Sequence, residues 1–211
     1  MAFMFYELAK YPEIQVKLQE EIITKLNSGN FIPTSDITPF KYSLIDDETL
    51  LPYMHAVIFE TFRVHAAIPG QEPRIVPSKG LLFRGNDIVS ACKIPAGTTV
   101  VMQPWSLHRV STVFPDPEEF IPQRWLDAGE EQLKVMKSHL FHFGSGARMC
   151  IGLNLATAEI KMIMASLIAR YRIELDNDFD YARDGEMLDI YTTLPRSEKM
   201  VLKFSPLVSS S

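Results

Sequence analysis

The stretch that decides the fold of this chain is Phe143-Gly144-Ser145-Gly146-Ala147-Arg148-Met149-Cys150-Ile151-Gly152. A single cysteine follows an arginine, stands among three glycines and precedes an apolar run with helical spacing. Glycines let the backbone come close to a bulky flat group, because they have no Cβ atom to clash with it. The start of a helix favours the negative charge of a thiolate, the form of cysteine that binds metal. The pattern therefore predicts a cysteine presented to a flat, metal-containing cofactor.

A plainer interpretation is a glycine-rich turn into a helix with a buried cysteine, since free cysteine is often part of a core. The stretch, however, matches Phe-Gly-x-Gly-x-Arg-x-Cys-x-Gly at all six fixed positions. It resembles the haem-binding signature of the cytochrome P-450 family, the haem-thiolate monooxygenases. The resemblance implies that Cys150 is the axial ligand of a haem b iron. It also implies that the following residues are neighbours of the haem: Phe143, Gly144, Arg148, Ile151 and Ala156.

Two shorter motifs resemble further parts of that family. Glu60 and Arg63 form a Glu-x-x-Arg whose members share one face of an expected helix. A solvated surface pair is the usual explanation of such a motif, but in the family the pair meets an arginine from a proline-rich segment. Arg124 matches that arginine, and Gln123 stands where the family often has glutamate. Two guanidinium groups on one carboxylate can hold three segments in register, so we expect a structural role for this triad.

Other positions are placed near the cofactor by the resemblance alone. Arg74 matches the arginine that reaches a haem propionate in the family, and the alternative is a surface arginine. His108 precedes Arg109 in a His-Arg pair, and either residue could approach a propionate or support the loop. Residues 65–72 and the turn at residues 192–193 match segments that border the substrate pocket.

Three further residues receive no cofactor role. Cys92 has no motif around it, so we expect it to pack within a strand. His139 and His142 flank the cysteine loop, and we expect both to be structural. No Cys-x-x-Cys pair occurs, which argues against a structural zinc site. With two cysteines in 211 residues, the chain fits a reducing, intracellular compartment better than a secreted disulfide scaffold.

The hydrophobic periodicity predicts one mainly α-helical domain with small β-sheets, an α+β chain without internal repeats or a dividing linker. This pattern agrees with the C-terminal, haem-proximal part of the cytochrome P-450 fold. The expected elements are helices over 2–27, interrupted at Pro12, and over 51–64; strands within 80–103; a proline-rich meander over 104–125; the cysteine loop 143–152; a helix over 152–171; and a strand-containing tail over 172–206.

Bulk composition excludes several classes of protein. The net charge of -5, without a basic excess, gives no indication of nucleic-acid binding. No apolar run reaches the ~20 residues that a membrane-spanning helix needs, and the first residues lack the basic region of a signal peptide. By resemblance, a full-length member lies at the endoplasmic reticulum membrane through an N-terminal anchor. We find no such anchor here and expect membrane association only through that missing part.

The chain starts within a helical pattern and without a cap, so we expect further sequence upstream of Met1. The resemblance covers what would be the C-terminal half of a family member. The family's acidic-Thr motif, which delivers protons to dioxygen, has no match, so no catalytic residue is assigned.

The expected reaction inserts one oxygen atom of dioxygen into a small apolar molecule, with electrons from an NADPH-dependent reductase. One alternative is a truncated remnant that binds haem without turnover or does not fold. Another is an α-rich interaction module with no cofactor, which would explain neither the cysteine loop nor Arg124.

Overall fold

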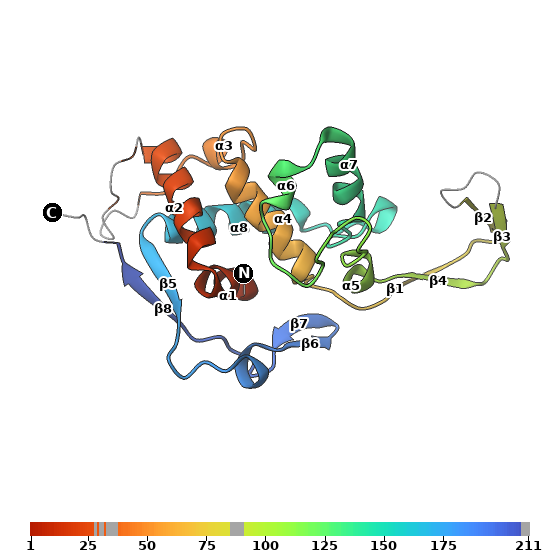
Figure 1. The fold of residues 1–211 in the computed structure, drawn as a ribbon. Coiled ribbons are helices and arrows are strands. Elements are labelled where there is room, and N and C mark those ends of the chain that lie inside the picture. Colours follow the sequence, from red (N-terminus) through yellow and green to blue (C-terminus); the bar gives the residue numbers. More distant parts are fainter. Residues whose placement is uncertain (28, 30–31, 33–37, 85–90, 208–211) are drawn as a thin grey trace.

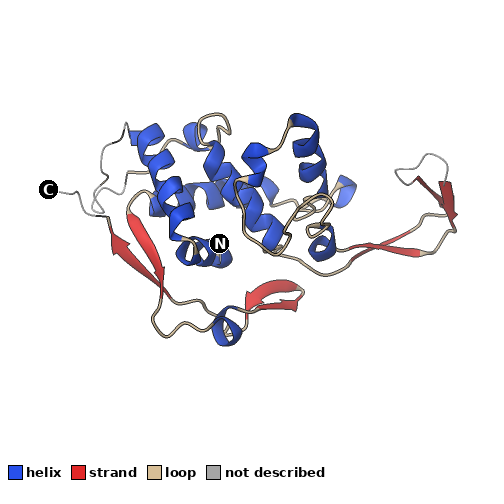
Figure 2. Ribbon diagram, in the orientation of Figure 1, coloured by secondary structure: helices blue, strands red, loops and turns tan. Residues whose placement is uncertain are grey.

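The computed structural model describes residues 1–211 except 28, 30–31, 33–37, 85–90 and 208–211. In the described part, the helices form one body and four two-stranded antiparallel sheets lie at its edges (Figures 1 and 2). This arrangement confirms the predicted α+β fold class. The helices are α1 (Ala2–Lys10), α2 (Pro12–Asn27), α3 (Tyr42–Ile45), α4 (Pro52–Val64), α5 (Pro104–Leu107), α6 (Arg124–Asp127), α7 (Glu130–His139) and α8 (Leu153–Ile168), with the short helical turns η1 (Gly146–Arg148) and η2 (Tyr181–Gly185). Among the described residues, no helix combines the length and apolar character that crossing a membrane requires.

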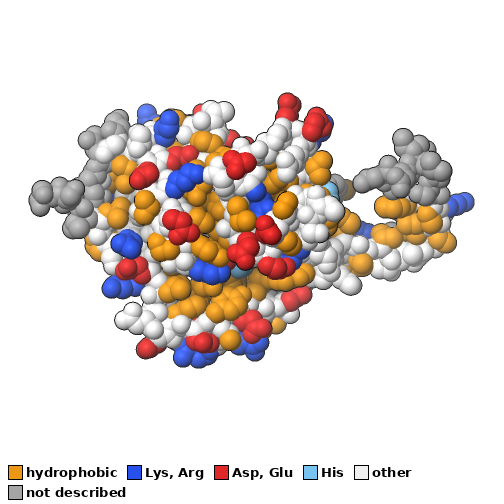
Figure 3. Space-filling view, in the orientation of Figure 1, with side chains coloured by type: hydrophobic (Ala, Val, Ile, Leu, Met, Phe, Trp, Pro, Cys, Tyr) orange, Lys and Arg blue, Asp and Glu red, His pale blue; other side chains and the backbone are white. Residues whose placement is uncertain are grey.

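The strands pair as antiparallel ribbons of two. The pairs are β1 (Glu72–Ile75) with β4 (Thr99–Met102), β2 (Leu81–Arg84) with β3 (Ala91–Ile94), β5 (Tyr171–Leu175) with β8 (Leu202–Pro206), and β6 (Met187–Ile190) with β7 (Thr192–Pro195). The first two ribbons form an arm that extends away from the helices (Figure 1). Hydrophobic side chains gather near the outer end of this arm in Figure 3. Leu82 and Phe83 of β2 are exposed.

The main core lies between the apolar faces of α1, α2, α4 and α8, with β5 beside them. Leu18 and Ile22 of α2 are fully buried and belong to one cluster with Met54 of α4 and Met164 of α8. Burying each such side chain stabilises the fold by roughly 1.5–3 kcal/mol. A second, smaller cluster joins α4 to the meander, α6 and α7 through Ala56, Phe114, Trp125 and Met136.

The structure departs from the sequence expectations in several elements. Helix α7 was not expected, because its sequence is largely polar and only Met136 is buried. Strand β1 precedes the expected strand range 80–103. The helix expected to reach residue 171 ends at Ile168, and Tyr171 begins β5 because it pairs there with β8. Cys92 lies on β3, but it is exposed rather than packed, since β3 pairs only with β2 in a two-stranded ribbon.

Candidate functional site

The cysteine loop is held in shape by its own backbone. The amide of Cys150 donates a hydrogen bond of 2.8 Å to the carbonyl oxygen of Phe143. Gly144 and Gly146 have φ values of +68° and +70°, in the left-handed region that residues with a Cβ atom rarely adopt. Gly152 then serves as the N-cap of α8. The loop therefore places the cysteine immediately before a helix of 16 residues.

Cys150 lies on an open, apolar surface. The cysteine is exposed, and beside it in sequence Ile151 is fully exposed and Met149 is 52% exposed. Leu155, one turn into α8, is 64% exposed. Exposed apolar surface of this kind marks a binding face in soluble proteins. A thiol among apolar side chains, with the exposed Arg148 next to it, fits a flat apolar cofactor that carries a metal and acidic edge groups, as haem does.

The carboxylate of Glu60 accepts five hydrogen bonds inside the protein. Arg63 donates through Nε to Oε2 at 2.9 Å and through Nη2 to Oε1 at 2.8 Å, and Arg124 donates through Nε to Oε1 at 3.1 Å. The amide of Ile121 and the indole of Trp125 add one bond each, both of 2.8 Å. The structure thus brings the Glu-x-x-Arg pair and Arg124 together. It also adds two donors that no sequence motif indicated.

The two guanidinium groups of this cluster also bind the backbone of the meander. Arg63 donates to the carbonyl oxygens of Pro117 at 2.6 Å and Glu119 at 2.7 Å, and Arg124 donates to that of Pro115 at 2.6 Å. The side chains of Glu60 and Arg63 are completely buried, and that of Arg124 is 9% exposed. Because one carboxylate is shared by both guanidinium groups, and their remaining N–H groups donate to backbone carbonyl oxygens, the cluster can fix α4 against the meander from inside the protein.

His108 is fully buried and uses both ring nitrogens. Nδ1 lies 3.1 Å from the carbonyl oxygen of Arg63, and Nε2 accepts a 2.8 Å hydrogen bond from the amide of Phe141. Burial lowers the pKa of His108 to about 4, so the ring is neutral near pH 7. This geometry corresponds to the loop-supporting alternative. With both nitrogens engaged, His108 has no free ring nitrogen for a propionate, and we do not assign it to the cofactor.

The base of the cysteine loop packs on α4 through aromatic rings. His142 stacks on Phe62 with ring centroids 4.2 Å apart, and Phe143 meets the same ring edge-on at 5.4 Å. Burial, with a smaller contribution from His108, lowers the pKa of His142 to about 3. At the end of α7, Nδ1 of His139 lies 2.8 Å from the carbonyl oxygen of Val135.

Arg74 lies on β1, which passes beside the cysteine loop. A carboxylate oxygen of Glu72 on the same strand would be 3.6 Å from a Cβ atom at Gly144. Arg74 is partly exposed, with Nη2 3.4 Å from that glutamate and Nη1 donating to the carbonyl oxygen of Pro73 at 2.9 Å. Ala156 is half-buried near the start of α8. Both positions therefore lie on elements adjacent to the loop.

The two segments expected to border a substrate pocket are joined to each other. Thr193 on β7 donates through its hydroxyl to the carbonyl oxygen of Ala66 at 2.6 Å and through its amide to that of Ala67 at 2.8 Å. A Cβ atom at Gly70 would lie 3.1 Å from the Asp189 carboxylate. Residues 65–72 and the β6–β7 hairpin therefore form one continuous surface.

Gln123, the departure from the family's usual glutamate, uses both ends of its amide group. Its oxygen accepts a hydrogen bond from Nζ of Lys17 on α2, and its nitrogen donates at 2.7 Å to a carboxylate oxygen of Asp127 on α6. The side chain thus links the meander to two helices.

The sequence matches the cytochrome P450 family model over residues 1–195. Cytochrome P450 monooxygenase BOT1 of Botryotinia fuckeliana is 33% identical over 175 residues, which are 83% of this chain and 30% of the relative. Cytochrome P450 monooxygenase cicH of Emericella nidulans is 35% identical over 176 residues, which are 83% of this chain and 32% of the relative. N-acetyltryptophan 6-hydroxylase ivoC of the same fungus is 32% identical over 185 residues, 86% of this chain and 33% of the relative.

The structure thus shows a loop shaped by glycines that presents an exposed cysteine immediately before a helix, and the comparisons show the family to which such a chain belongs. The chain belongs to the cytochrome P450 family. This confirms the resemblance in the cysteine loop, and the relatives named above are fungal. The family implies a haem iron as cofactor. The chain spans about a third of the length of the curated relatives that it matches, less than the half expected from the sequence.

Proposed function

We propose that this chain forms the cysteine-ligand side of a haem-dependent monooxygenase. The reaction inserts one oxygen atom of dioxygen into a small apolar molecule, with electrons from an NADPH-dependent reductase at the endoplasmic reticulum membrane. The observation that carries the proposal is the exposed Cys150 on an apolar surface, in a loop shaped by two glycines with positive φ. The family match and the fungal monooxygenases support it.

In this proposal, Cys150 would hold a haem b iron through its thiolate. Haem with a thiolate ligand supplies the cleavage of the O–O bond of dioxygen. Ile151 and Ala156 contribute apolar contacts to the ring, and Gly144 keeps the loop free of a side chain. Arg148, which is exposed beside the cysteine, pairs with a propionate.

Arg74 is proposed as a second propionate partner. Its current partners are weak ones, a 3.4 Å contact to Glu72 and a neighbouring carbonyl oxygen, and its side chain is 45% exposed. A propionate that binds the guanidinium of Arg74 would therefore break only weak contacts. Phe143 packs against Phe62 of α4 and is proposed as a neighbour of the haem.

The Glu60, Arg63 and Arg124 cluster is proposed to be structural. It holds α4 against the meander. His108 on the meander accepts a hydrogen bond from the amide of Phe141, and Phe141 leads into the cysteine loop. The cluster therefore acts on the haem only through the position of that loop.

A haem-binding spectrum tests the proposal. The 211-residue chain is reconstituted with haem, reduced and treated with carbon monoxide, and the Soret band is recorded. A strongly red-shifted band reports thiolate ligation, and Cys150→Ala should remove that band while Cys92→Ala keeps it. Cys92 is a matched control because it is the chain's other cysteine and is also exposed.

Two outcomes would count against the proposal. Haem uptake with the red-shifted band retained in Cys150→Ala would reject the ligand assignment. The absence of haem uptake by the unmutated chain would favour a remnant that does not form the site. Where the band forms, turnover of apolar test compounds with a reductase and NADPH separates the monooxygenase from a haem-binding remnant.

A further inference from the structure

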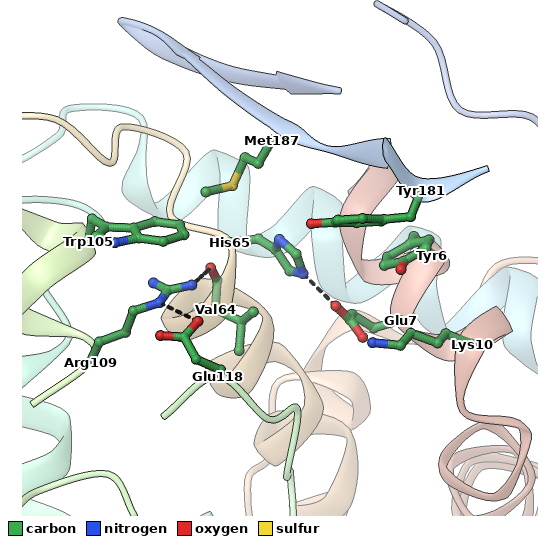
Figure 4. Close-up of a pocket in the computed structure, with 10 residues that line it drawn as sticks. All are labelled: Tyr6, Glu7, Lys10, Val64, His65, Trp105, Arg109, Glu118, Tyr181 and Met187. Atoms are coloured by element: carbon green, nitrogen blue, oxygen red, sulfur yellow. Dashed lines mark hydrogen bonds and ion pairs between the residues drawn. The ribbon is translucent and has the colours of Figure 1, made fainter. Parts of the chain in front are cut away.

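A cavity of about 430 Å³ lies between α1, the end of α4, the meander and the segment that leads into β6 (Figure 4). Its volume falls within the range of small-molecule sites, roughly 300–1,000 Å³. No residue of the cysteine loop 143–152 is among those that line it. The proposal below therefore goes beyond the proposed function and does not depend on the haem.

Unpartnered buried polar atoms concentrate at this cavity. Among the residues that the structure describes, four buried side-chain atoms have no hydrogen-bond partner, and three belong to residues that line this cavity: Glu7 Oε2, His65 Nδ1 and Arg109 Nη1. The side chains of Glu7, His65 and Arg109 are 5%, 7% and 10% exposed. A buried polar atom without a partner is costly, so native proteins satisfy nearly all of them.

The hydrogen bonds that these residues already make decide whether each unpartnered atom is a donor or an acceptor. Nε2 of His65 lies 2.7 Å from Oε1 of Glu7, and Phe3 stacks on the imidazole at 4.6 Å. Burial lowers the pKa of His65, so the ring is neutral near pH 7. The proton then lies on Nε2, which faces the carboxylate, and Nδ1 is a hydrogen-bond acceptor.

The walls of the cavity combine aromatic side chains with charged ones. In Figure 4, Trp105 and Tyr181 lie on opposite sides of the space, with His65 between them and Met187 above. The indole of Trp105 also covers the guanidinium of Arg109, whose carbon atom is 3.3 Å from the ring centroid. Aromatic side chains on both sides of the space suit a ligand with an aromatic ring, which can pack edge-to-face against them.

The charges at the cavity cancel. Glu7 and Glu118 face Lys10 and Arg109, and Arg109 is bound to Glu118 through Nε at 3.1 Å. A charged ligand would gain no net attraction from this set, so a neutral one fits best.

We propose that this cavity binds a neutral, planar aromatic molecule that carries a hydrogen-bond donor on its edge, such as a phenol. Its O–H or N–H group donates to Nδ1 of His65, and its ring lies between Trp105 and Tyr181. Nδ1 is buried from solvent, so binding requires a wall to turn outward. Tyr181 and Trp105, which are 46% and 37% exposed, can do so without disturbing the core.

The test compares two probes of nearly the same shape on the 211-residue chain. 2-Naphthol carries the required O–H donor, and 2-methoxynaphthalene replaces it with a methyl ether. Binding is followed by ligand-observed saturation-transfer NMR. We expect saturable binding of 2-naphthol and at least tenfold weaker binding of the ether.

Three variants locate the site. His65→Phe keeps a flat ring for the stack on Phe3 but removes Nδ1, and it should weaken 2-naphthol binding about tenfold. Trp105→Ala removes a wall that is not part of the core, and it should weaken both probes at least fivefold. Phe83→Ala removes an exposed aromatic ring on β2, outside the cavity, and should change neither affinity.

Equal affinity of the two probes would overturn the proposal, because binding would then rest on apolar contact alone. So would unchanged binding in Trp105→Ala, or no saturable binding up to the solubility of 2-naphthol, which would mean that the cavity holds only solvent. If His65→Phe fails to fold, the two probes and Trp105→Ala still decide the question.

Discussion

The surroundings of Glu60 and of Cys150 show two opposite ways in which this chain uses its polar groups. The Glu60 carboxylate is completely buried, and all five donors around it belong to the chain itself. The thiol of Cys150 is exposed on an apolar surface, and the hydrogen bonds of its loop serve the backbone. The polar groups around Glu60 bind only one another, whereas the side chain of Cys150 is left exposed to bind a group from outside the chain.

This difference separates stability from binding. A buried and fully hydrogen-bonded charge cluster loses much when one member is removed, because the others remain buried without a partner. An exposed side chain such as Cys150 can be replaced with little change in the free energy of unfolding. Mutations in the two regions should therefore give different combinations of stability loss and haem loss.

The largest effect is expected from Glu60→Ala, which leaves the buried Arg63 and the nearly buried Arg124 without their carboxylate. We expect the free energy of unfolding to fall by about 3–5 kcal/mol, measured by urea denaturation. Glu119→Ala is the matched control, because it removes an exposed carboxylate but keeps the carbonyl oxygen that Arg63 uses. A loss below about 1 kcal/mol in Glu60→Ala would contradict the structural role of the cluster.

The next effect concerns pH and two histidines between the regions, the buried His108 and the partly buried His142. In the unfolded chain a histidine takes up a proton below about pH 6.5, whereas in the fold the pKa of His108 is about 4 and that of His142 about 3. Falling pH therefore stabilises the unfolded state. Each histidine should lower the free energy of unfolding by about 2 kcal/mol between pH 7 and pH 5.

His142→Phe measures one of these two contributions, because phenylalanine preserves the stack on Phe62 and does not titrate. Urea denaturation of the variant at pH 7 and pH 5 should show a loss that is smaller by about 2 kcal/mol than in the unmutated chain. An identical loss in both proteins would show that His142 does not resist protonation.

A smaller effect is expected within the cysteine loop itself. Gly146→Ala forces a side chain onto a residue with φ of +70°, which costs about 1–2 kcal/mol even though a Cβ atom would meet nothing within 4 Å. Gly152→Ala is the control, because its φ is -84° and its Cβ would make an ordinary 3.8 Å contact with Sγ of Cys150. Equal stabilities of the two variants would show that the loop is not shaped by backbone conformation.

The smallest effect is expected at an exposed ion pair that belongs to neither region. Arg172 and Glu174 approach to 3.6 Å, and their side chains are 61% and 42% exposed. Arg172→Ala should change the free energy of unfolding by less than about 1 kcal/mol. A larger loss would mean that charge pairing in general, rather than burial, explains the sensitivity expected at Glu60.

The sequence could predict what depends on local spacing. The glycines around Cys150 follow from their freedom to take positive φ, and Glu60 and Arg63 share a helix face because they lie three residues apart. Ile121 and Trp125 were not recognised as partners of Glu60, since their donors reach it only through the tertiary path of the meander.

Other features could not be predicted from the spacing of residues, for similar reasons. The role of His108 depended on which carbonyl and amide groups surround its ring in the fold. The cavity could not be predicted from the sequence, because its lining residues come from distant segments that no motif connects, among them Tyr6, His65, Trp105 and Tyr181. Helix α7 was not predicted, because a mostly polar helix with one buried residue has almost no apolar stripe.

The two-sided use of the Gln123 amide has a consequence for how this chain can vary. Glutamate at this position could still accept a hydrogen bond from Lys17, but it has no N–H to donate and would place a second carboxylate against Asp127. Because both side chains lie at the surface, glutamate at position 123 should cost only about 0.2–0.5 kcal/mol. A neutral residue at position 127 should remove that cost, so the two positions are coupled.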